Sequence, residues 1–371
     1  MTNAVTDETT SDLFPRRIGL LTGGGDAPGL NAVIRSVVRS ATFCGCTCLG
    51  IEESFNGLMS SGGSRILTLD DVIGLERIGG TILGTSNKGD PFAYPVDGSS
   101  QLNDFSSDCV DKFKALELEA LIVVGGDGTL DIAHKFHRLG MPIVGVPKTI
   151  DNDIVGTNST FGFDTAVSFA TEAIDRLHTT AHAHSRVIVV EVMGRHAGWI
   201  ALYAGVAGGA DAILIPEVEF DLHRVAEVVS EREQRGRRST IVVVAEGAVL
   251  KGGSVIVQEE GREGRLDRLG GIGARVAERL EALTNKEART VVLGHLQRGG
   301  TPTSFDRVLA TRFGGKAFKL IQRRVFGVMV ANRPPNLIAV PLADVVGKTK
   351  HVPLDLDLMH TARGLGVSFG D

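Results

Sequence analysis

The chain has 371 residues, of which 43% are hydrophobic and 22% are charged. This composition provides a substantial buried core and excludes a fibrous or intrinsically disordered protein. The formal net charge of -5 argues against general binding to nucleic acid, although a local group of Arg and His side chains can still hold an anionic ligand. The most apolar segments, such as VIVVEVM at 187–193, are too short to cross a bilayer as helices.

Two features indicate a soluble, cytoplasmic protein without a membrane anchor. Residues 1–14 are polar and Thr-rich, without the basic start and apolar stretch of a secretory signal, so we expect a mobile tail. Cys44, Cys46 and Cys48 alternate with other residues and would share one face of a strand. The C-x2-C spacing of structural zinc sites is missing, so we expect small buried thiols in a reducing compartment.

In chain order, short β-branched runs are followed by glycine-rich loops and amphipathic stretches. The run RIGLLT at 17–22 precedes GGGDAPGLNAVIRSVVRS, and LIVV at 121–124 precedes GGDGT and a helical pattern. A second series begins near Phe163 and includes RVIVVEVM at 186–193 and TIVVVAEG at 240–247. No Pro/Ser-rich linker separates the two series. We therefore predict an α/β fold with two interwoven three-layer α/β/α lobes and largely parallel sheets.

Two glycine-rich loops after predicted strands are suited to phosphate. In TGGGDAPG at 22–29, exposed backbone amides suit an anion, although tight turns also need glycine for conformational reasons alone. In GGDGT at 125–129, Asp127 follows a parallel strand, where a carboxylate can help coordinate hydrated Mg²⁺. Gly126 and Gly128 let phosphates approach the main chain closely. A helix cap is the other interpretation of Asp127.

The loop PKTIDND at 147–153 concentrates polar groups after another strand. Phosphoryl transfer needs a carboxylate near the acceptor hydroxyl and close alignment of both substrates. Asp151 is our candidate general base, and we expect Asp153 to position Asp151 or the metal ion.

The motifs GGGDAPG, GGDGT, PKTIDND, EVMGR, AEG and GHLQRGG follow one another in this order. With them the chain resembles the phosphofructokinase family over roughly residues 17–320. The resemblance implies Mg-dependent transfer of the γ-phosphoryl group of ATP to the 1-hydroxyl of fructose 6-phosphate, a step of glycolysis. It also implies a donor lobe at 15–162 plus about 300–345, a sugar-phosphate lobe at 163–299, and a C-terminal extension at 346–371.

The same resemblance assigns roles to single residues. Asp127 would bind Mg²⁺, and Asp151 would accept the proton of the 1-hydroxyl. Arg195 would stabilise the phosphoryl group in transit, and Glu246 would hold sugar hydroxyls. The donor would contact Gly24, Gly126, Asp127, Gly128 and Thr129, and the acceptor would contact Thr149, Asp151, Met193, Gly194, Arg195 and Glu246.

Four further residues match family positions that grip the 6-phosphate of the sugar: Arg186, Arg289, His295 and Arg298. Fork-shaped guanidinium donors suit a phosphate. In the family, some of these side chains reach across from a neighbouring subunit, so the resemblance implies a homo-oligomer, expected to be a homotetramer.

The residues near the donor give conflicting indications. Gly128 resembles ATP-using members, because the Asp that pyrophosphate users carry there would obstruct the inner phosphate of a nucleotide. Lys148 resembles the pyrophosphate-using branch. Asn87 stands where many bacterial relatives have an Arg, and Lys88 can replace that charge but not its bidentate geometry. We expect ATP as the donor, with pyrophosphate or ADP as the alternative.

A basic effector pocket of bacterial relatives is matched by Arg35, Arg39, Arg235 and Arg237, and His178 replaces another cationic member of it. Regulation by a phosphorylated metabolite is one interpretation, and solvated surface charges are the other.

Two other functions compete with this interpretation. A different GGDGT-containing kinase, acting on a dinucleotide or a lipid, would leave PKTIDND, EVMGR and GHLQRGG unexplained. A catalytically silent regulatory subunit that binds sugar phosphate would have no need of Asp127, Asp151 and Arg195, which this chain contains.

Overall fold

The computed structural model describes residues 15–59, 63–86, 89–95, 102–259 and 268–371. Backbone contacts divide them into two compact units. Unit 1 contains the described residues of Met1–Lys148, Gly156–Asn158 and Ser304–Gly347, and unit 2 contains those of Thr149–Val155, Ser159–Thr303 and Lys348–Asp371. The chain leaves unit 1 directly after Lys148, whereas the lobe boundary expected from the sequence lies at residue 162. The assignment of a donor lobe and an acceptor lobe stays a prediction.

Unit 1 is built on a sheet whose described strands follow the order β16-β15-β7-β6-β1-β2-β3. Neighbouring strands from β15 to β2 are parallel, and the antiparallel strands β16 and β3 form the edges. Every residue of β6 is buried, as expected of a parallel strand covered on both faces. These strands are β1 (Arg17–Thr22), β2 (Thr47–Ile51), β3 (Ser64–Leu67), β6 (Ala120–Gly125), β7 (Ile143–Thr149), β15 (Val328–Arg333) and β16 (Asn336–Pro341).

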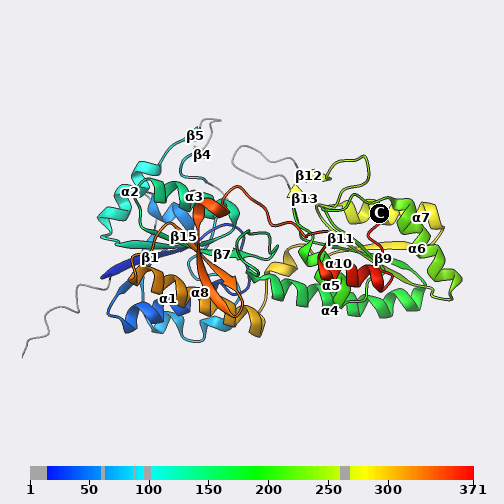
Figure 1. Cartoon of the computed structure of the whole chain (residues 1–371), viewed down its shortest axis with the longest axis horizontal. Coiled ribbons are helices and arrows are strands. Elements are labelled where there is room, and N and C mark those ends of the chain that lie inside the picture. Colours follow the sequence, from blue (N-terminus) through cyan, green and yellow to red (C-terminus); the bar gives the residue numbers. More distant parts are fainter. Residues whose placement is uncertain (1–14, 60–62, 87–88, 96–101, 260–267) are drawn as a thin grey trace, which may run out of the picture. The chain divides into compact units, whose positions relative to one another are not determined.

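Helices cover both faces of this sheet. Figure 1 shows α1 and α8 side by side on one face and α2 and α3 on the other. Ser36 Oγ on α1 donates a hydrogen bond to Thr311 O on α8 at 2.7 Å. A Cβ at Gly314 would lie 2.7 Å from Val33 O, so glycine is needed where the two helices touch. The helices of unit 1 are α1 (Leu30–Phe43), α2 (Ser106–Ala115), α3 (Asp127–Arg138), α8 (Ser304–Gln322) and α9 (Leu342–Val345), and strand β4 (Tyr94–Pro95) pairs antiparallel with β5 (Leu102–Asn103).

The cysteines expected on one face of a strand are placed differently. Cys44 is the exposed C-cap residue of α1, and only Cys48 lies within β2, because the helix extends to Phe43. Burial raises the pKa of Cys46 to about 12, which keeps this thiol protonated and unreactive. The prediction of buried thiols is therefore confirmed for Cys46 and Cys48 and wrong for Cys44.

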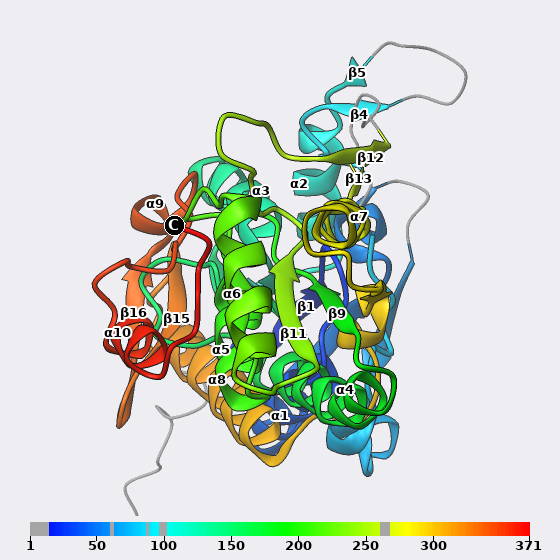
Figure 2. The ribbon, with the colours of Figure 1, turned by 90° about the vertical axis from the view of Figure 1, so that its right-hand side faces the viewer.

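Unit 2 contains the parallel sheet β10-β11-β9-β14. Helices α6 and α7 pack on it through a core that includes Val189, Val242 and Val276. Figure 2 shows β9 and β11 side by side with α7 and α4 on opposite sides. The predicted α/β class, with largely parallel sheets between helices, is confirmed. The elements are β8 (Phe161–Gly162), α4 (Phe163–His184), β9 (Val187–Val192), α5 (Trp199–Ala207), β10 (Ala212–Leu214), α6 (Leu222–Gln234), β11 (Thr240–Ala245), β12 (Val257–Glu259), β13 (Arg268–Leu269), α7 (Ile272–Thr284), β14 (Ala288–Val292), the 3-10 helix η5 (Gly294–Arg298) and α10 (Asp357–Gly364).

Residues 348–371 pack as part of unit 2. Thr349 forms a β-bridge with Ile154 at their start, and near their end Ser368 forms one with Ala212 of β10. Phe369 beyond it is fully buried. The C-terminal residues therefore extend the second sheet.

Across the described ranges of both units, no helix combines the length and the apolar character that spanning a membrane requires.

Candidate functional site

The glycine-rich loop after β1 is bonded to a second loop of unit 1. Gly24 has a φ of 75°, and its N–H donates to Ser86 O at 3.1 Å. Thr85 Oγ1 donates in turn to Gly24 O at 2.5 Å. At the far end of the loop, Gly29 forms the N-cap of α1 with a φ of 113°, a conformation that favours glycine. These bonds fix the path of the loop between β1 and α1.

The GGDGT loop joins β6 to α3 and is supported from inside by Thr129. This side chain is buried and would collide with a Cβ at Gly23 or at Gly125, so both positions need glycine. Asp127 and Gly128 are exposed in the first turn of α3. A Cβ at Gly128 would meet no atom within 4 Å. The loop presents a carboxylate and open backbone at its surface, while Thr129 packs beneath the two glycine-rich loops.

Lys148 connects the end of β7 to the loop after β1. Its residue is only 3% exposed, and its Nζ donates to Gly25 O. A Cβ at Gly126 would lie 3.5 Å from Lys148 O. Unit 1 thus brings together Gly24, the loop 126–129 and Lys148. Lys88, also expected near the donor, lies outside the described residues.

A cavity of about 590 Å³ opens in unit 1 at the residues that follow β2. Its lining includes Glu52, Glu53 and Leu83. Thr22, the last residue of β1, donates to Gly84 O at 2.8 Å and so ties the cavity wall to the strand that carries the glycine-rich loop. The volume is typical of a small-molecule site. No motif marks these residues, so the sequence alone does not identify them.

Asp127 is the candidate for a metal ion. Within the described ranges, no three His, Cys, Asp or Glu side chains lie close enough to form a metal site. Mg²⁺ often keeps several waters and binds one or two carboxylates plus substrate phosphates. An exposed carboxylate beside the open backbone of Gly128 fits that mode of binding.

In unit 2, the loop around Asp151 is held by hydrogen bonds. Asp151 N–H donates to Thr149 Oγ1 at 3.1 Å, and Thr160 Oγ1 donates to Thr149 O at 2.8 Å. Asn152 is buried with a φ of 53°, and its Oδ1 accepts from Thr160 N–H at 3.2 Å. The two candidate carboxylates, Asp151 and Asp153, therefore flank a residue whose conformation is fixed.

Lys350 contacts this loop although it lies 198 residues away from Asn152 in the chain. Its Nζ donates to Asn152 Oδ1 at 2.9 Å. Burial lowers the pKa of Lys350 to about 8, and the attraction of Asp153 opposes this shift. Lys350 is not predicted from the sequence, because a single lysine in a segment without a motif gives no indication of its contacts.

The EVMGR and AEG motifs meet beyond the carboxyl ends of β9 and β11. Gly247 N–H donates to Gly194 O at 3.1 Å. A Cβ at Gly247 would collide with Arg195 O, so glycine lets the two loops touch. Gly194 has a φ of 141°, and Met193 before it is half-buried. Glu246 and Arg195 are thereby brought to neighbouring loops.

Electrostatic interactions connect Glu246 to its surroundings. Burial is the largest cause that raises the pKa of Glu246, and the nearby charge of Glu191 raises it further. Arg298 and Arg195 act in the opposite direction. Arg298 and His295 both belong to η5, which follows β14. Unit 2 thus gathers Arg195, Glu246 and Arg298 within electrostatic reach of one another.

The four residues expected at the 6-phosphate are not all gathered in one place. Arg186 directly precedes β9, and Arg289 is the second residue of β14, where it pairs with Ile188. Both guanidinium groups bond to Glu287. Arg298 follows the other end of β14. Because a strand of 5 residues spans roughly 17 Å, Arg186 and Arg289 lie apart from Arg298 within one chain.

The four arginines expected at an effector site lie in two different units. Arg35 on α1 pairs with Glu76 at 2.9 Å in unit 1, and Arg39 follows on the same helix. Arg235 and Arg237 are exposed beyond the end of α6 in unit 2. Each unit therefore contributes two of them.

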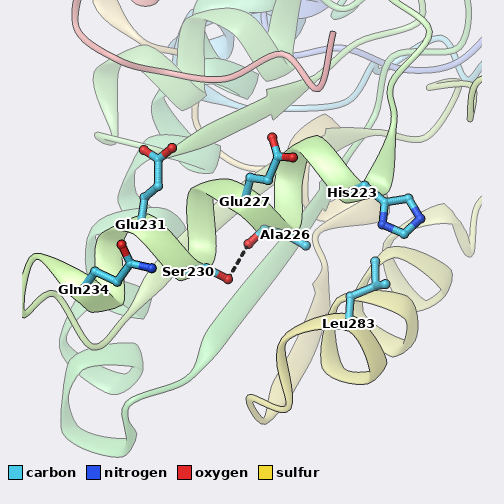
Figure 3. Close-up of a pocket in the computed structure, with 7 residues that line it drawn as sticks. All are labelled: His223, Ala226, Glu227, Ser230, Glu231, Gln234 and Leu283. Atoms are coloured by element: carbon cyan, nitrogen blue, oxygen red, sulfur yellow. Dashed lines mark hydrogen bonds between the residues drawn. The ribbon is translucent and has the colours of Figure 1, made fainter.

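A groove of about 340 Å³ runs along α6 near Arg235. Figure 3 shows the carboxylates of Glu227 and Glu231 on the helix, with His223 beside Leu283 at one end. An acidic lining repels a phosphate. This groove is therefore unsuited to a phosphorylated effector.

Comparisons with known proteins give consistent matches. A family model described as Phosphofructokinase matches residues 17–321. A Chloroflexus aurantiacus protein named ATP-dependent 6-phosphofructokinase is 54% identical over 359 residues, which are 96% of this chain and 98% of that protein. An Amycolatopsis mediterranei protein named pyrophosphate–fructose 6-phosphate 1-phosphotransferase is 49% identical over 91% of this chain and 97% of its own length. The crystal structure of Pichia pastoris phosphofructokinase in the T-state is 32% identical with a TM-score of 0.79, covering 89% of this chain and 35% of the yeast chain.

Proposed function

This chain belongs to the phosphofructokinase family, and we propose that it transfers the γ-phosphoryl group of ATP to the 1-hydroxyl of fructose 6-phosphate, as a glycolytic enzyme of the cytoplasm. The observation that carries the proposal is the close similarity to an ATP-dependent 6-phosphofructokinase along almost the whole chain. Unit 1 would bind the donor and unit 2 the acceptor. The consecutive residues Lys148 and Thr149 belong to one unit each, so a single peptide bond joins the proposed donor and acceptor loops.

Two features of unit 1 support ATP as the donor. The space beside Gly128 is free, and the cavity at Glu53 and Leu83 has room for a nucleoside, which pyrophosphate does not need. Lys148 is the feature shared with pyrophosphate users, but its ammonium bonds to Gly25 O and so supports the glycine-rich loop. Pyrophosphate and ADP are the alternative donors, and the 49% identical relative is named for pyrophosphate.

The acceptor chemistry would be performed by residues of unit 2. Asp151 would take the proton of the 1-hydroxyl as the oxygen attacks the γ-phosphorus. Thr149 would contact the acceptor, and its Oγ1 already accepts a hydrogen bond from the Asp151 backbone. Arg195 would stabilise the negative charge of the phosphoryl group in transit. Glu246 would accept hydrogen bonds from sugar hydroxyls, which is favourable for a buried carboxylate.

Asp127 would hold the metal ion, with Gly126 and Gly128 giving the phosphates access to the backbone. When bound, Mg²⁺ supplies positive charge that neutralises the phosphate oxygens of the donor. Gly24 and Thr129 complete the proposed donor site, Gly24 through its backbone and Thr129 by supporting both loops.

The proposed assembly is a homotetramer. Arg186 and Arg289 lie a strand length away from Arg298 in their own chain, which supports their binding the 6-phosphate in the site of a neighbouring subunit. His295 and Arg298 of that neighbouring subunit would bind the same 6-phosphate. The proposed effector is a phosphorylated metabolite, which Arg35, Arg39, Arg235 and Arg237 would bind.

The test is production of fructose 1,6-bisphosphate by the purified protein with fructose 6-phosphate, Mg²⁺ and ATP, ADP or pyrophosphate supplied separately. We expect activity with ATP. Activity with pyrophosphate or ADP instead of ATP would support phosphorylation of fructose 6-phosphate but would show that ATP is not the donor. Binding of fructose 6-phosphate without product from any donor would identify the silent regulatory subunit and overturn the proposal.

A further inference from the structure

The segment 349–352 of unit 2 runs alongside the loop that carries the proposed base. Thr349 forms an antiparallel β-bridge with Ile154. Lys350 N–H donates to Asp153 O at 2.7 Å, and Lys350 Nζ donates to Asn152 Oδ1 at 2.9 Å. Main chain and side chain of Lys350 therefore hold two consecutive residues of this loop.

The opposite side of the same segment bonds to the loop that follows Arg195. The indole N–H of Trp199 donates to Lys350 O at 2.8 Å, and the Lys350 ammonium lies 5.4 Å from the centroid of the Trp199 ring. His351 Nδ1 donates to His196 O at 2.9 Å. His196 directly follows Arg195, so the segment 349–352 joins the two loops that carry the proposed base and the proposed phosphoryl-stabilising arginine.

Glu217 strengthens this junction. Its Oε1 accepts hydrogen bonds from Val352 N–H at 2.8 Å and from Gly198 N–H at 3.1 Å. The carboxylate therefore bonds the C-terminal segment and the Arg195 loop at once. Lys350 is therefore bonded to the loop of Asp151 on one side and to the start of α5 on the other.

We propose that Lys350 is a positioning residue for phosphoryl transfer, which holds Asn152 and thereby the carboxylates of Asp151 and Asp153 in register with the Arg195 loop. This role rests on the proposed function. Asn152 lies between the two carboxylates with a φ of 53°, a left-handed conformation that asparagine adopts more readily than most residues. Its side-chain bonds to Lys350 and Thr160 therefore hold the loop at this position. Burying the lysine ammonium beside an aromatic ring is costly unless it is paired, and its partners include the Trp199 ring and the loop that it holds. A small displacement of a catalytic carboxylate is enough to slow transfer severely.

The test compares Lys350→Met, Lys350→Arg and Lys251→Met in the full-length protein, with wild type assayed in parallel. Met keeps the length of the side chain and removes the donor, while Arg keeps the charge and the donor. Lys251 is an exposed lysine of the same unit and controls for loss of a charge. The readouts are kcat with ATP, the Kd of fructose 6-phosphate, and the fluorescence of Trp199, the single tryptophan of the chain.

We expect Lys350→Met to lower kcat by about tenfold or more while the Kd of fructose 6-phosphate changes less than about threefold, because Lys350 contacts the loop of the base and not the phosphate-binding residues. Lys350→Arg should recover part of kcat, Lys251→Met should match wild type, and Trp199 emission should shift only in the Lys350 variants. A folded Lys350→Met protein with wild-type kcat overturns the role. So does a parallel loss of kcat and sugar affinity, because that result indicates a general structural defect.

Asn152→Gly gives a second measurement that does not depend on the folding of Lys350→Met. Glycine adopts a φ of 53° without strain, so this variant removes the side chain that accepts from Lys350 and Thr160 while the backbone can keep its path. We expect kcat to fall about as much as in Lys350→Met. The double variant Lys350→Met/Asn152→Gly should be no slower than the slower of the two single variants, because both changes break the same hydrogen bond between Lys350 and Asn152. The positioning role of Lys350 is overturned if the losses of kcat from the two substitutions add in full in the double variant. It is also overturned if Asn152→Gly leaves kcat unchanged. An inactive wild type would overturn the proposed function first, and this role with it.

Discussion

The carboxylate of Glu287 lies 2.6 Å from Nε of Arg186, and it also bonds to Arg289. The Arg186 guanidinium is the main cause that holds the pKa of Glu287 below its usual value. Exposed ion pairs of this kind contribute little to stability. The arrangement matters instead for binding, because Glu287 occupies the donors of two arginines proposed to grip the sugar phosphate of a neighbouring subunit.

Glu287→Gln is expected to lower the KM for fructose 6-phosphate by about two- to fivefold, since a neutral amide competes less well with a phosphate for the two guanidinium groups. Thermal stability should change little. Steady-state kinetics measures the effect, with Glu278→Gln as control, because Glu278 is an exposed glutamate of α7. A higher KM would mean that Glu287 orients the arginines rather than competing for them.

Gly128→Asp is expected to shift donor use from ATP toward pyrophosphate without unfolding the protein. The new side chain has free space, and an acidic residue in the first turn of α3 is favourable there. Its charge would repel the inner phosphate of ATP and lower kcat/KM for ATP by about tenfold or more. The ratio of the two activities is measured in Gly128→Asp and in Gly128→Ala, which adds bulk without charge. Equal ratios in wild type and Gly128→Asp would remove Gly128 as a selectivity determinant.

Asp151→Ser is expected to lower turnover by roughly 10² to 10⁴ while fructose 6-phosphate still binds, because the variant removes the proposed base but not the phosphate-binding residues. Isothermal titration measures the binding and a coupled assay measures turnover. Turnover equal to wild type would exclude Asp151 as the base.

Glu246 gives a pH-dependent prediction for stability. Its folded-state pKa is raised above the reference value of 4.5, chiefly by burial. The protonated side chain of Glu246 therefore makes its full contribution to the free energy of unfolding below pH 4.5. That contribution is lost as the pH rises through the raised pKa, because the buried carboxyl group then ionises. We expect Glu246→Gln to gain stability relative to wild type as the pH increases from about 4.5 to 8. Urea unfolding at several pH values tests this, and a difference that does not vary with pH would show that Glu246 has no raised pKa.

The sheets and the polar loops could be predicted from the sequence because each depends on local pattern. β-branched runs indicate parallel strands, and the glycines around Asp127 and before α1 mark turns at their ends. The positions of Asp151 and Arg195 followed from motifs, and their roles stay predictions. Local pattern gives a wrong prediction at Cys44, because α1 extends to Phe43.

The remaining parts of the site depend on contacts that no local pattern encodes. Lys350 meets Asn152 from 198 residues away. The cavity at Glu52 and Glu53 is also lined by Leu83, which lies well beyond them in the chain. The separation of Arg186 from Arg298 is visible only once β9 and β14 are paired in register.

The interleaving of the two units has a consequence for synthesis of the protein. Unit 1 gains α8, β15 and β16 only after most of unit 2 has been made, and unit 2 in turn gains Lys350 and Phe369 only from its last residues. A multidomain chain commonly folds its first domain while the ribosome is still making the next. Here unit 1 lacks part of its sheet until residues 304–347 have been made, and unit 2 lacks its last segment until residues 348–371 have been made, so we infer that neither unit completes its native contacts before those residues leave the ribosome.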